Sequence, residues 1–286
     1  KDSFFSGLNL DWDVSKMQNY RFSVVHGWGK DRLSYLNPYG YDLNANWNLD
    51  KFRFNYEVGY DSESFAHLWN VDYIIPKLAL NARLRDVSKK YLSSTGYGAY
   101  VGELGGSFGV SYAPTAKLSL SSRVDIFQDR LNPSLEDDNR WNENFYWDAT
   151  YAIDPLTSIR LDFNLDNQLG RVSQYRTYNE GLSLYKAFEL IRKINTFLTY
   201  RHQESTYYTA HSSDSINNQI SSGLRFSLLG DLYYYLNGEL NWLEERYAGN
   251  NSRPRAMETG VDWTGQILKS PFYGSFRCTY RNEENT

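Results

Sequence analysis

The feature that most constrains this chain is an alternation of apolar and polar residues that recurs along its whole length. It is clearest from Lys51 to Tyr60, which reads K-F-R-F-N-Y-E-V-G-Y. Apolar or aromatic residues occupy positions 52, 54, 56, 58 and 60, and Arg53, Asn55, Glu57 and Gly59 lie between them. Because successive side chains of a β-strand point to opposite faces, this pattern predicts a strand with one apolar and one polar face.

Sixteen segments repeat this pattern, and we see no convincing helix. The alternation is shortest in the segment from Tyr178 to Lys186. The alternating positions lie within residues 8–14, 20–24, 41–47, 51–60, 69–75, 78–84, 104–112, 118–126, 145–153, 159–165, 178–186, 194–200, 222–228, 232–242, 257–263 and 272–280.

The connections between these segments alternate in length. Short connections are expected at residues 15–18, 48–50, 76–77, 113–117, 154–157, 188–192, 229–231 and 266–271. Longer polar connections are expected at 30–38, 61–66, 86–95, 127–142, 166–177, 203–217 and 243–255. Tight turns at one end of an even number of strands and long loops at the other are typical of bacterial outer-membrane barrels, whereas sandwiches mix their loop lengths.

The composition narrows the class of protein further. The 25 Tyr, 15 Phe and 8 Trp make up 17% of the chain, yet its mean hydropathy is −0.63. There is no run of about 18 apolar residues, which excludes transmembrane helices. The net charge of −4 argues against nucleic acid as a partner, and the single Cys278 allows no internal disulfide.

The two faces of the strands predict which solvent each one meets. A barrel of about 16 strands encloses a space too wide for side chains to fill, and its polar faces carry too many charges for a dry interior. We therefore expect the apolar face to meet lipid and the charged face to line a water-filled lumen. The fold predicted from these patterns is all-β, a transmembrane antiparallel up-and-down β-barrel of about 16 strands (range roughly 14–18) with a polar lumen, and it forms a single domain over residues 1–286.

Aromatic residues near the ends of the predicted strands suit the membrane interface. Tyr and Trp place their ring bodies among acyl chains and their polar atoms among head groups. The predicted interfacial residues are Trp12, Tyr20, Trp28, Trp47, Tyr60, Trp69, Tyr112, Tyr151, Trp242, Trp263 and Tyr280.

Acidic and basic residues alternate between successive strands on the predicted inward face. Neighbouring strands lie about 4.8 Å apart, so acids and arginines can pair across the ladder. Such residues form either a charge-paired wall that fixes strand register or a transverse field that selects solutes. The predicted lumen-lining residues are Asp11, Asp13, Arg21, Asp42, Arg53, Glu57, Asp72, Arg83, Arg85, Glu103, Arg123, Asp125, Asp148, Arg160, Asp162, Arg225, Glu239, Asp262 and Arg277.

Aromatic residues also fall at predicted inward positions. Their flat rings can stack on the apolar C–H faces of sugars, or they simply fill space, and a register error of one residue would exchange the two faces. The candidates for sugar stacking are Tyr146, Tyr185, Tyr233, Tyr235 and Tyr273, and Phe197 has a similar position.

The longest predicted loop, residues 127–142, contains Glu136, Asp137 and Asp138. These acids either form a constriction inside the lumen or lie in solvent outside it, and the second placement is favoured because such loops are usually solvated.

Motifs that would indicate an enzyme or a metal site are weak. The four histidines show no metal-ligand spacing. His202 and Ser205 are three residues apart and therefore point to opposite faces of a strand, while His211 and Ser213 fall in a polar loop. Without a third group to orient the imidazole, neither pair predicts a nucleophile and its base, so we expect no catalytic residue, metal or cofactor.

In pattern, and over its whole length, the chain resembles the Gram-negative outer-membrane β-barrels. Its strand number is similar to that of the general porins and of the C-terminal barrels of exopolysaccharide export proteins. The resemblance implies a location in the outer membrane of a Gram-negative bacterium with both termini periplasmic. It also implies a non-enzymatic channel for polar solutes, leaning to carbohydrate (oligo- or exopolysaccharide), that works by passive conduction through a charge-lined lumen.

Two other functions remain open on the same resemblance. In the first, the barrel is an anchor or sleeve that a partner protein plugs in a larger envelope complex. In the second, it is an outer-membrane lipid hydrolase. The expected partners are outer-membrane lipid, a small polar solute or saccharide, and periplasmic or envelope proteins, with no nucleic acid.

Overall fold

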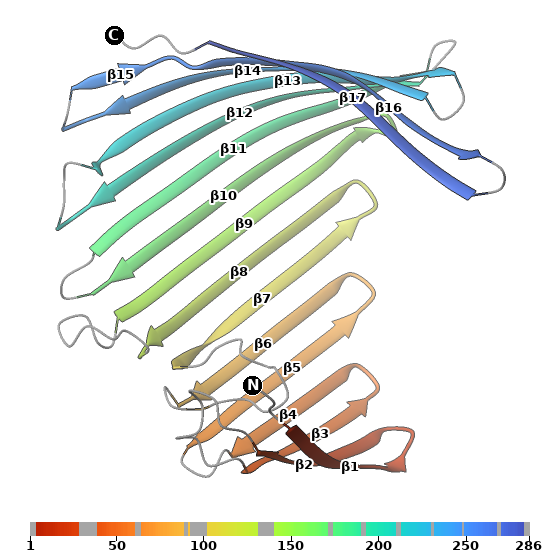
Figure 1. The fold of residues 1–286 in the computed structure, drawn as a ribbon, viewed down its shortest axis with the longest axis vertical. Coiled ribbons are helices and arrows are strands. Elements are labelled where there is room, and N and C mark those ends of the chain that lie inside the picture. The colour runs from red at the N-terminus through yellow and green to blue at the C-terminus, as the bar shows by residue number, and fades with distance from the viewer. Residues whose placement is uncertain are drawn as a thin grey trace. The chain divides into compact units, whose positions relative to one another are not determined.

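A computed structural model describes residues 4–28, 39–60, 64–88, 91, 102–130, 140–170, 174–189, 193–209, 213–229, 232–247, 249–267 and 270–282. Over these ranges the chain is all-β, with 17 strands in one antiparallel sheet (Figure 1). In the described ranges, no helix has the length and apolar character needed to cross a membrane.

The strands follow one another along the chain with few residues between them. The first eight are β1 (Phe4–Ser15), β2 (Gln18–Trp28), β3 (Tyr39–Leu49), β4 (Phe52–Tyr60), β5 (Phe65–Ile75), β6 (Leu78–Val87), β7 (Glu103–Thr115) and β8 (Leu118–Asp129). The others are β9 (Arg140–Asp154), β10 (Thr157–Leu169), β11 (Gln174–Glu189), β12 (Lys193–Tyr207), β13 (Ser215–Leu229), β14 (Leu232–Glu245), β15 (Asn250–Ser252), β16 (Arg255–Ile267) and β17 (Ser270–Asn282).

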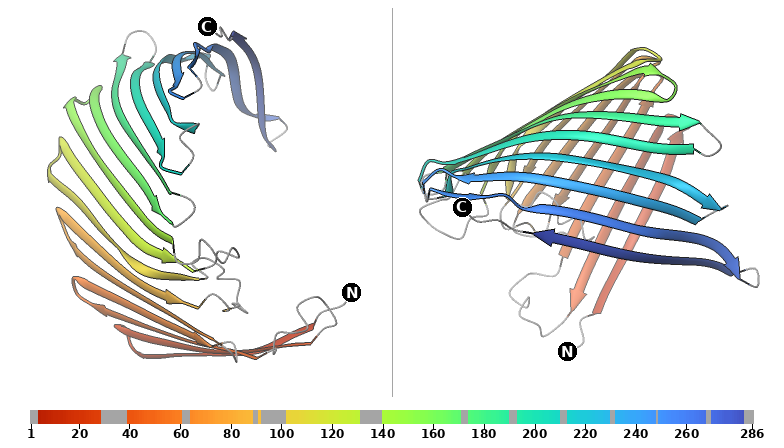
Figure 2. Two further views of the ribbon diagram at one scale, coloured as in Figure 1. Left: turned by 90° about the vertical axis from the view of Figure 1, so that its left-hand side faces the viewer. Right: turned by 90° about the horizontal axis from the view of Figure 1, so that it is seen from above.

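Each long strand pairs with the next long strand in the chain, which is up-and-down topology. β14 pairs with both the short β15 and the long β16. The colours in Figure 1 run through the strands in this order, and Figure 2 shows β11 to β14 side by side. Consecutive pairing means that every predicted strand hydrogen-bonds to its nearest neighbours in sequence, which confirms the predicted fold class.

All sixteen predicted strands are present, and two details differ from expectation. The segment with the shortest predicted alternation, Tyr178–Lys186, lies in the 16-residue β11, which pairs with β12 from Tyr175–Tyr207 to Glu189–Lys193. The full length of this strand was not predicted because its terminal residues are polar, and the pairing with β12 continues beyond the apolar residues. The sequence also missed β15, whose three polar residues pair with Leu243–Glu245 of β14.

The predicted alternation of connection lengths is confirmed. Two or three residues separate β1 from β2, β3 from β4, and so on through β16 and β17, and at least four residues separate the other neighbouring long strands. Side chains close several tight turns: Ser15 Oγ accepts from the Met17 amide at 3.1 Å and Asp154 Oδ1 from the Leu156 amide at 2.7 Å. The connection between β10 and β11, predicted over 166–177, spans only residues 170–173.

This connectivity also places the chain ends. Since a tight turn follows β1 and precedes β17, the chain enters β1 and leaves β17 at strand ends that carry the longer connections. The periplasmic placement of both termini, which the resemblance implies, stays a prediction.

The chain forms two compact units. The first comprises residues 1–112, 121–145 and 167–173, and the second comprises residues 113–120, 146–166 and 174–286. The expected single domain over residues 1–286 stays a prediction.

Neither unit has an apolar core of ordinary size. Among the described residues, the buried apolar side chains are Ala45, Ala66, Val87 and Tyr235, and no large side chain is fully buried. Leu198 of the second unit and Trp12 of the first are each about half exposed, at 51% and 50%. The apolar face of the sheet thus lies open to its surroundings instead of packing inward.

Aromatic side chains on this apolar face contact each other between strands. In the first unit, Trp12 and Tyr20 stack with their ring centroids 5.2 Å apart, and Trp47 Nε1 donates to Tyr20 Oη at 3.1 Å. Tyr56 and Trp69 are 4.1 Å apart. Such pairs contribute roughly 0.5–1.5 kcal/mol each beyond the area they bury, so they help to hold the strand register.

One close approach of strands depends on a glycine. A Cβ added to Gly105 of β7 would lie 2.2 Å from the Ile126 carbonyl oxygen and 2.6 Å from Phe127 Cβ of β8. We predict that Gly105→Ala lowers the free energy of unfolding, measured by urea denaturation in detergent, by about 1–3 kcal/mol. Gly109→Ala on the same strand is the control, because its Cβ would meet no atom closer than 3.8 Å. Equal losses for the two variants would contradict the close approach.

Candidate functional site

The polar face of the first unit carries a row of asparagines that the sheet register aligns. Asn19 of β2 stands opposite Asn46 of β3, which stands opposite Asn55 of β4, and Asn55 stands opposite Asn70 of β5. Directly opposite residues share a face of the sheet, with Cβ atoms about 5 Å apart, within reach of an amide hydrogen bond. The row therefore forms a continuous strip of amide groups across four strands.

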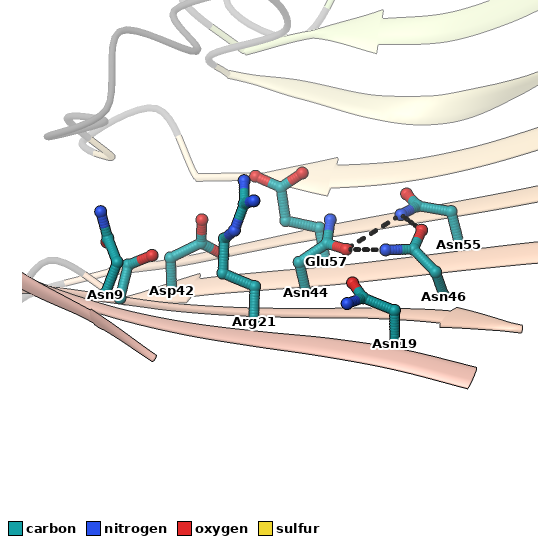
Figure 3. A pocket seen from close by; sticks show the side chains of 9 residues that line it. Asn9, Asn19, Arg21, Asp42, Asn44, Asn46, Asn55 and Glu57 are labelled. Carbon is teal, nitrogen blue, oxygen red and sulfur yellow. Dashed lines mark hydrogen bonds between the residues drawn. The ribbon is translucent and has the colours of Figure 1, made fainter. Parts of the chain in front are cut away.

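Three amides in this region bind one another. Asn46 Nδ2 donates to Asn44 Oδ1 at 2.7 Å, and Asn55 Nδ2 donates to Asn46 Oδ1 at 2.6 Å and to Asn44 Oδ1 at 3.3 Å (Figure 3). Each side chain is thus held in one orientation by its neighbours.

These amides lie in an open pocket of about 390 Å³ on the polar face. Its residues come from β1 to β4, and Figure 3 shows their side chains on the same side of the strands. The lining residues are Asn9, Asn19, Arg21, Ser23, Asp42, Asn44, Asn46, Asn55 and Glu57. Among them, Arg21, Asp42 and Glu57 are predicted lumen-lining residues. The alternation D-L-N-A-N from Asp42 to Asn46 is a signal that could have found two of the asparagines as well.

The charged groups of the pocket are two carboxylates and one guanidinium. Arg21 Nε donates to Asp11 Oδ1 at 2.6 Å across β1 and β2, and both side chains are more than half exposed. Asp42 Oδ1 is buried and has no hydrogen-bond partner among the described residues. With Asp42 and Glu57 against Arg21, the pocket holds more negative than positive charge.

A second cluster on the polar face of the first unit centres on Arg85. Its side chain is 2% exposed, and its Nε donates to Glu103 Oε2 at 2.5 Å and its Nη1 to Asp125 Oδ1 at 2.8 Å. The guanidinium carbon also lies 4.6 Å from the centre of the Phe127 ring. One buried cation thereby ties β6 to β7 and β8.

Two further arginines extend this cluster toward the long connections. Arg130 Nη2 donates to Asp86 Oδ1 and to the Val87 carbonyl, each at 2.8 Å, and Arg140 Nη2 donates to Asp129 Oδ2 at 2.6 Å. Neither arginine was predicted from the sequence, because both lie at strand ends, where the alternation of apolar and polar residues does not indicate a partner.

On the polar face of the second unit, arginines bind tyrosines. Arg160 Nη2 donates to Tyr146 Oη at 2.8 Å, and Arg277 Nε donates to Tyr235 Oη at 3.2 Å. The guanidinium carbon of Arg225 lies 4.8 Å from the centre of the Tyr233 ring. Three of the five tyrosines proposed for sugar stacking therefore have an arginine partner, while Tyr185 and Tyr273 are 42% and 66% exposed.

The pairing of acids with arginines is confirmed in part. Asp11 pairs with Arg21 as expected, whereas Asp13 Oδ1 accepts from Asn19 at 2.6 Å. In the second unit, Arg277 pairs with Glu258 and Arg225 with Asp262, each at 3.6 Å. Asp148 and Asp162 both interact electrostatically with Arg160, and Glu239 Oε1 accepts from Asn241 at 2.6 Å.

In three places the sheet register sets neighbours other than the next charged residue along the chain. Asp42 stands opposite Gly59, while Arg53 stands opposite Asp72. Asp72 Oδ1 accepts from Asn81 at 2.5 Å, and Arg83 donates to Asn70 at 2.8 Å. Glu103 binds Arg85 instead of Arg123, which lies 3.8 Å from Asp125. Glu136, Asp137 and Asp138 lie outside the described residues.

The histidine candidates do not form catalytic pairs in the described ranges. His202 Nδ1 hydrogen-bonds Asn218 Oδ1 at 2.8 Å, while Ser205 Oγ hydrogen-bonds Thr177 Oγ1 at 3.1 Å. His211 is outside the described residues. Within the same ranges, no group of three or more His, Cys, Asp or Glu is arranged to hold a metal ion.

Comparison with known proteins identifies the fold. No family model matches the chain, and no curated protein matches it significantly. The chain is similar to the solved structure of a loop L8 deletion mutant of OmpT, an outer membrane protein of Vibrio cholerae, with a TM-score of 0.50 and 10% identity over 99% of this chain and 94% of that one. It is also similar to an anion-selective porin from Comamonas acidovorans, with a TM-score of 0.46 and 9% identity over 98% and 90%. At these identities, the first likeness shows the fold alone, that of an outer-membrane β-barrel protein.

The Arg85 cluster generates a stability prediction. Arg85→Met would remove the cation bound to Glu103 and would leave Asp125 with only the exposed Arg123 at 3.8 Å. We expect this substitution to lower the free energy of unfolding in urea by about 3 kcal/mol. Arg123→Met is the matched control: the Arg123 side chain is 57% exposed and lies 3.8 Å from Asp125, so we expect a change of about 0–1 kcal/mol. A loss for Arg123→Met as large as that for Arg85→Met would show that Arg85 does not hold the strands together.

Proposed function

Because the chain has the fold of outer-membrane β-barrel proteins, we propose that it is a channel of the Gram-negative outer membrane that passes polar solutes by passive conduction. The observation that carries the proposal is the separation of the two faces of the sheet. Large apolar side chains such as Leu198 are exposed on one face, and charged and amide groups bind one another on the other.

Lipid is the partner that fits the apolar face. Burial of apolar surface contributes about 25 cal/mol per Å², so a sheet that exposes large apolar side chains such as Leu198 and Trp12 to water would associate or aggregate. In a bilayer the same face meets hydrocarbon, and pairing between neighbouring strands satisfies the backbone groups that they share. The strands of 9 to 16 residues are long enough to span a membrane when tilted, except for β15.

Water is the partner that fits the polar face. Its Arg–acid and Arg–tyrosine contacts leave many charged groups more than half exposed, among them Arg225 and Arg277. Exposed ions of both signs are stable only where water solvates them, which supports an aqueous lumen on this side. The same face is rich in amides and tyrosines, which supports a preference for carbohydrate among polar solutes.

We predict that a positive charge destabilises the folded protein more on the apolar face of the sheet than on the polar face. Leu198→Arg places a cation in the middle of the apolar positions of β12, and we expect it to make the free energy of folding into lipid bilayers less favourable by about 2–4 kcal/mol. Ser221→Arg on the polar face stands opposite Glu239 of β14 and is expected to change that free energy by less than about 0.5 kcal/mol. A larger cost for Ser221→Arg than for Leu198→Arg would reverse the assignment of faces.

The channel itself is tested by planar-bilayer recording of the purified full chain. We expect stable ohmic conductance steps in KCl, since an open, water-filled lumen passes small ions. Silence of properly folded protein would contradict the channel and favour a sleeve whose lumen a partner protein fills. Folding is checked beforehand by the β-type circular dichroism spectrum of the same sample.

A further inference from the structure

We infer that the asparagine pocket of β1 to β4 is a binding subsite for a neutral saccharide. The inference rests on the proposed function, because a solute reaches this pocket by way of the lumen only if the polar face lines it. It goes further by assigning a place, a set of contacts and a charge preference to the solute.

The amides suit hydroxyl groups. A sugar hydroxyl both donates and accepts a hydrogen bond, and each asparagine side chain offers donors and an acceptor within about 2 Å of each other. Asn44, Asn46 and Asn55 already hold one another at 2.6 to 3.3 Å. The binding groups are thus oriented before the solute arrives, which reduces the entropy lost on binding.

Asp42 adds a carboxylate to the lining of the pocket. Its Oδ1 is buried, and no described protein group donates to it. A solute hydroxyl that donates to this carboxylate forms a charge-assisted hydrogen bond, which is stronger than a bond between neutral groups.

A tyrosine ring that is not itself one of the lining residues contacts the strand next to Asp42. A Cβ on Gly59 would lie 2.1 Å from Tyr91 Oη and 2.8 Å from Tyr91 Cζ, so the ring rests directly on Gly59. Gly59 is the residue opposite Asp42 in the sheet register. Tyr91 comes from the connection between β6 and β7, and its ring adds an apolar surface of the kind that the C–H face of a sugar packs against.

The charges of the pocket favour neutral over anionic sugars. Asp42 and Glu57 face the pocket, and the one cation, Arg21, is already bound to Asp11. A uronate or phosphorylated sugar would bring a third negative charge to this region, which like-charge repulsion disfavours.

The experiment measures binding of maltotriose and of tri-galacturonate to the folded full chain in detergent by titration calorimetry, and current block by each sugar in bilayers. Maltotriose is expected to bind and to block the current, and tri-galacturonate to bind at least about 10-fold more weakly. Asn55→Leu removes amide hydrogen bonds at nearly constant volume and is expected to weaken maltotriose binding roughly 3- to 10-fold. Asn81→Leu is the matched control, because Asn81 is an amide of the same face that binds Asp72 outside the pocket.

A second pair of variants tests the contribution of the Tyr91 ring. Gly59→Ala displaces the Tyr91 ring without changing a pocket amide and is expected to weaken maltotriose binding roughly 3-fold or more, while Gly109→Ala leaves it unchanged. Conductance without any effect of maltotriose would overturn the subsite and leave the channel standing. Equal weakening by Asn55→Leu and Asn81→Leu would also overturn it. Maltotriose binding that depends on Asn55 in a protein that does not conduct would support the subsite and overturn the channel.

Discussion

The structure depends on one constraint: every long strand has an apolar side and a polar side, and among the described residues the apolar side is not packed into a core of ordinary size. Four buried apolar side chains among the described residues cannot supply the free energy that an ordinary soluble domain gains from its core. The apolar side must therefore be covered by something outside the chain. Hydrocarbon does this without further contacts, and it favours paired strands because unpaired backbone groups are costly in lipid.

The polar groups on the other side of the sheet are satisfied in two ways. Around Arg85, a buried guanidinium with two carboxylates satisfies charge with charge and ties three strands together. Around Asn46, uncharged amides satisfy one another and leave an open, solvated pocket. The first arrangement favours rigidity and the second leaves hydrogen-bonding capacity for a solute, so the two interpretations of the inward face, as a wall and as a selective surface, apply to different parts of it.

Much of the fold was predictable from the sequence because alternation is a local property that a single strand displays. The positions of Phe52 to Tyr60 fix a strand and its two faces without reference to any neighbour. Pairing between strands is not local: Asp42 meets Gly59 instead of Arg53, because a tight turn fixes the register and a shift by a few residues changes every partner. β15 was not predicted because its three residues are all polar and therefore show no alternation of apolar and polar residues.

The pocket was the least predictable part. The asparagines of β2 to β5 form a row only after the registers of three strand pairs are known, and Tyr91 reaches Gly59 from a connection that carries no alternation. The Arg–tyrosine contacts of the second unit were missed for a related reason, since Arg277 and Tyr235 are 42 residues apart.

We propose that hydrocarbon meets one side of each strand and that water meets the other. Spin labels placed one at a time along β12, from Ile194 to Gln203 in a Cys278→Ser background, measure this directly in liposomes. We expect accessibility to oxygen, which concentrates in lipid, to peak at the even positions, and accessibility to a water-soluble nickel chelate to peak at the odd positions. Accessibility to the two reagents that varies with any other period, or an alternation of the opposite phase, would contradict it.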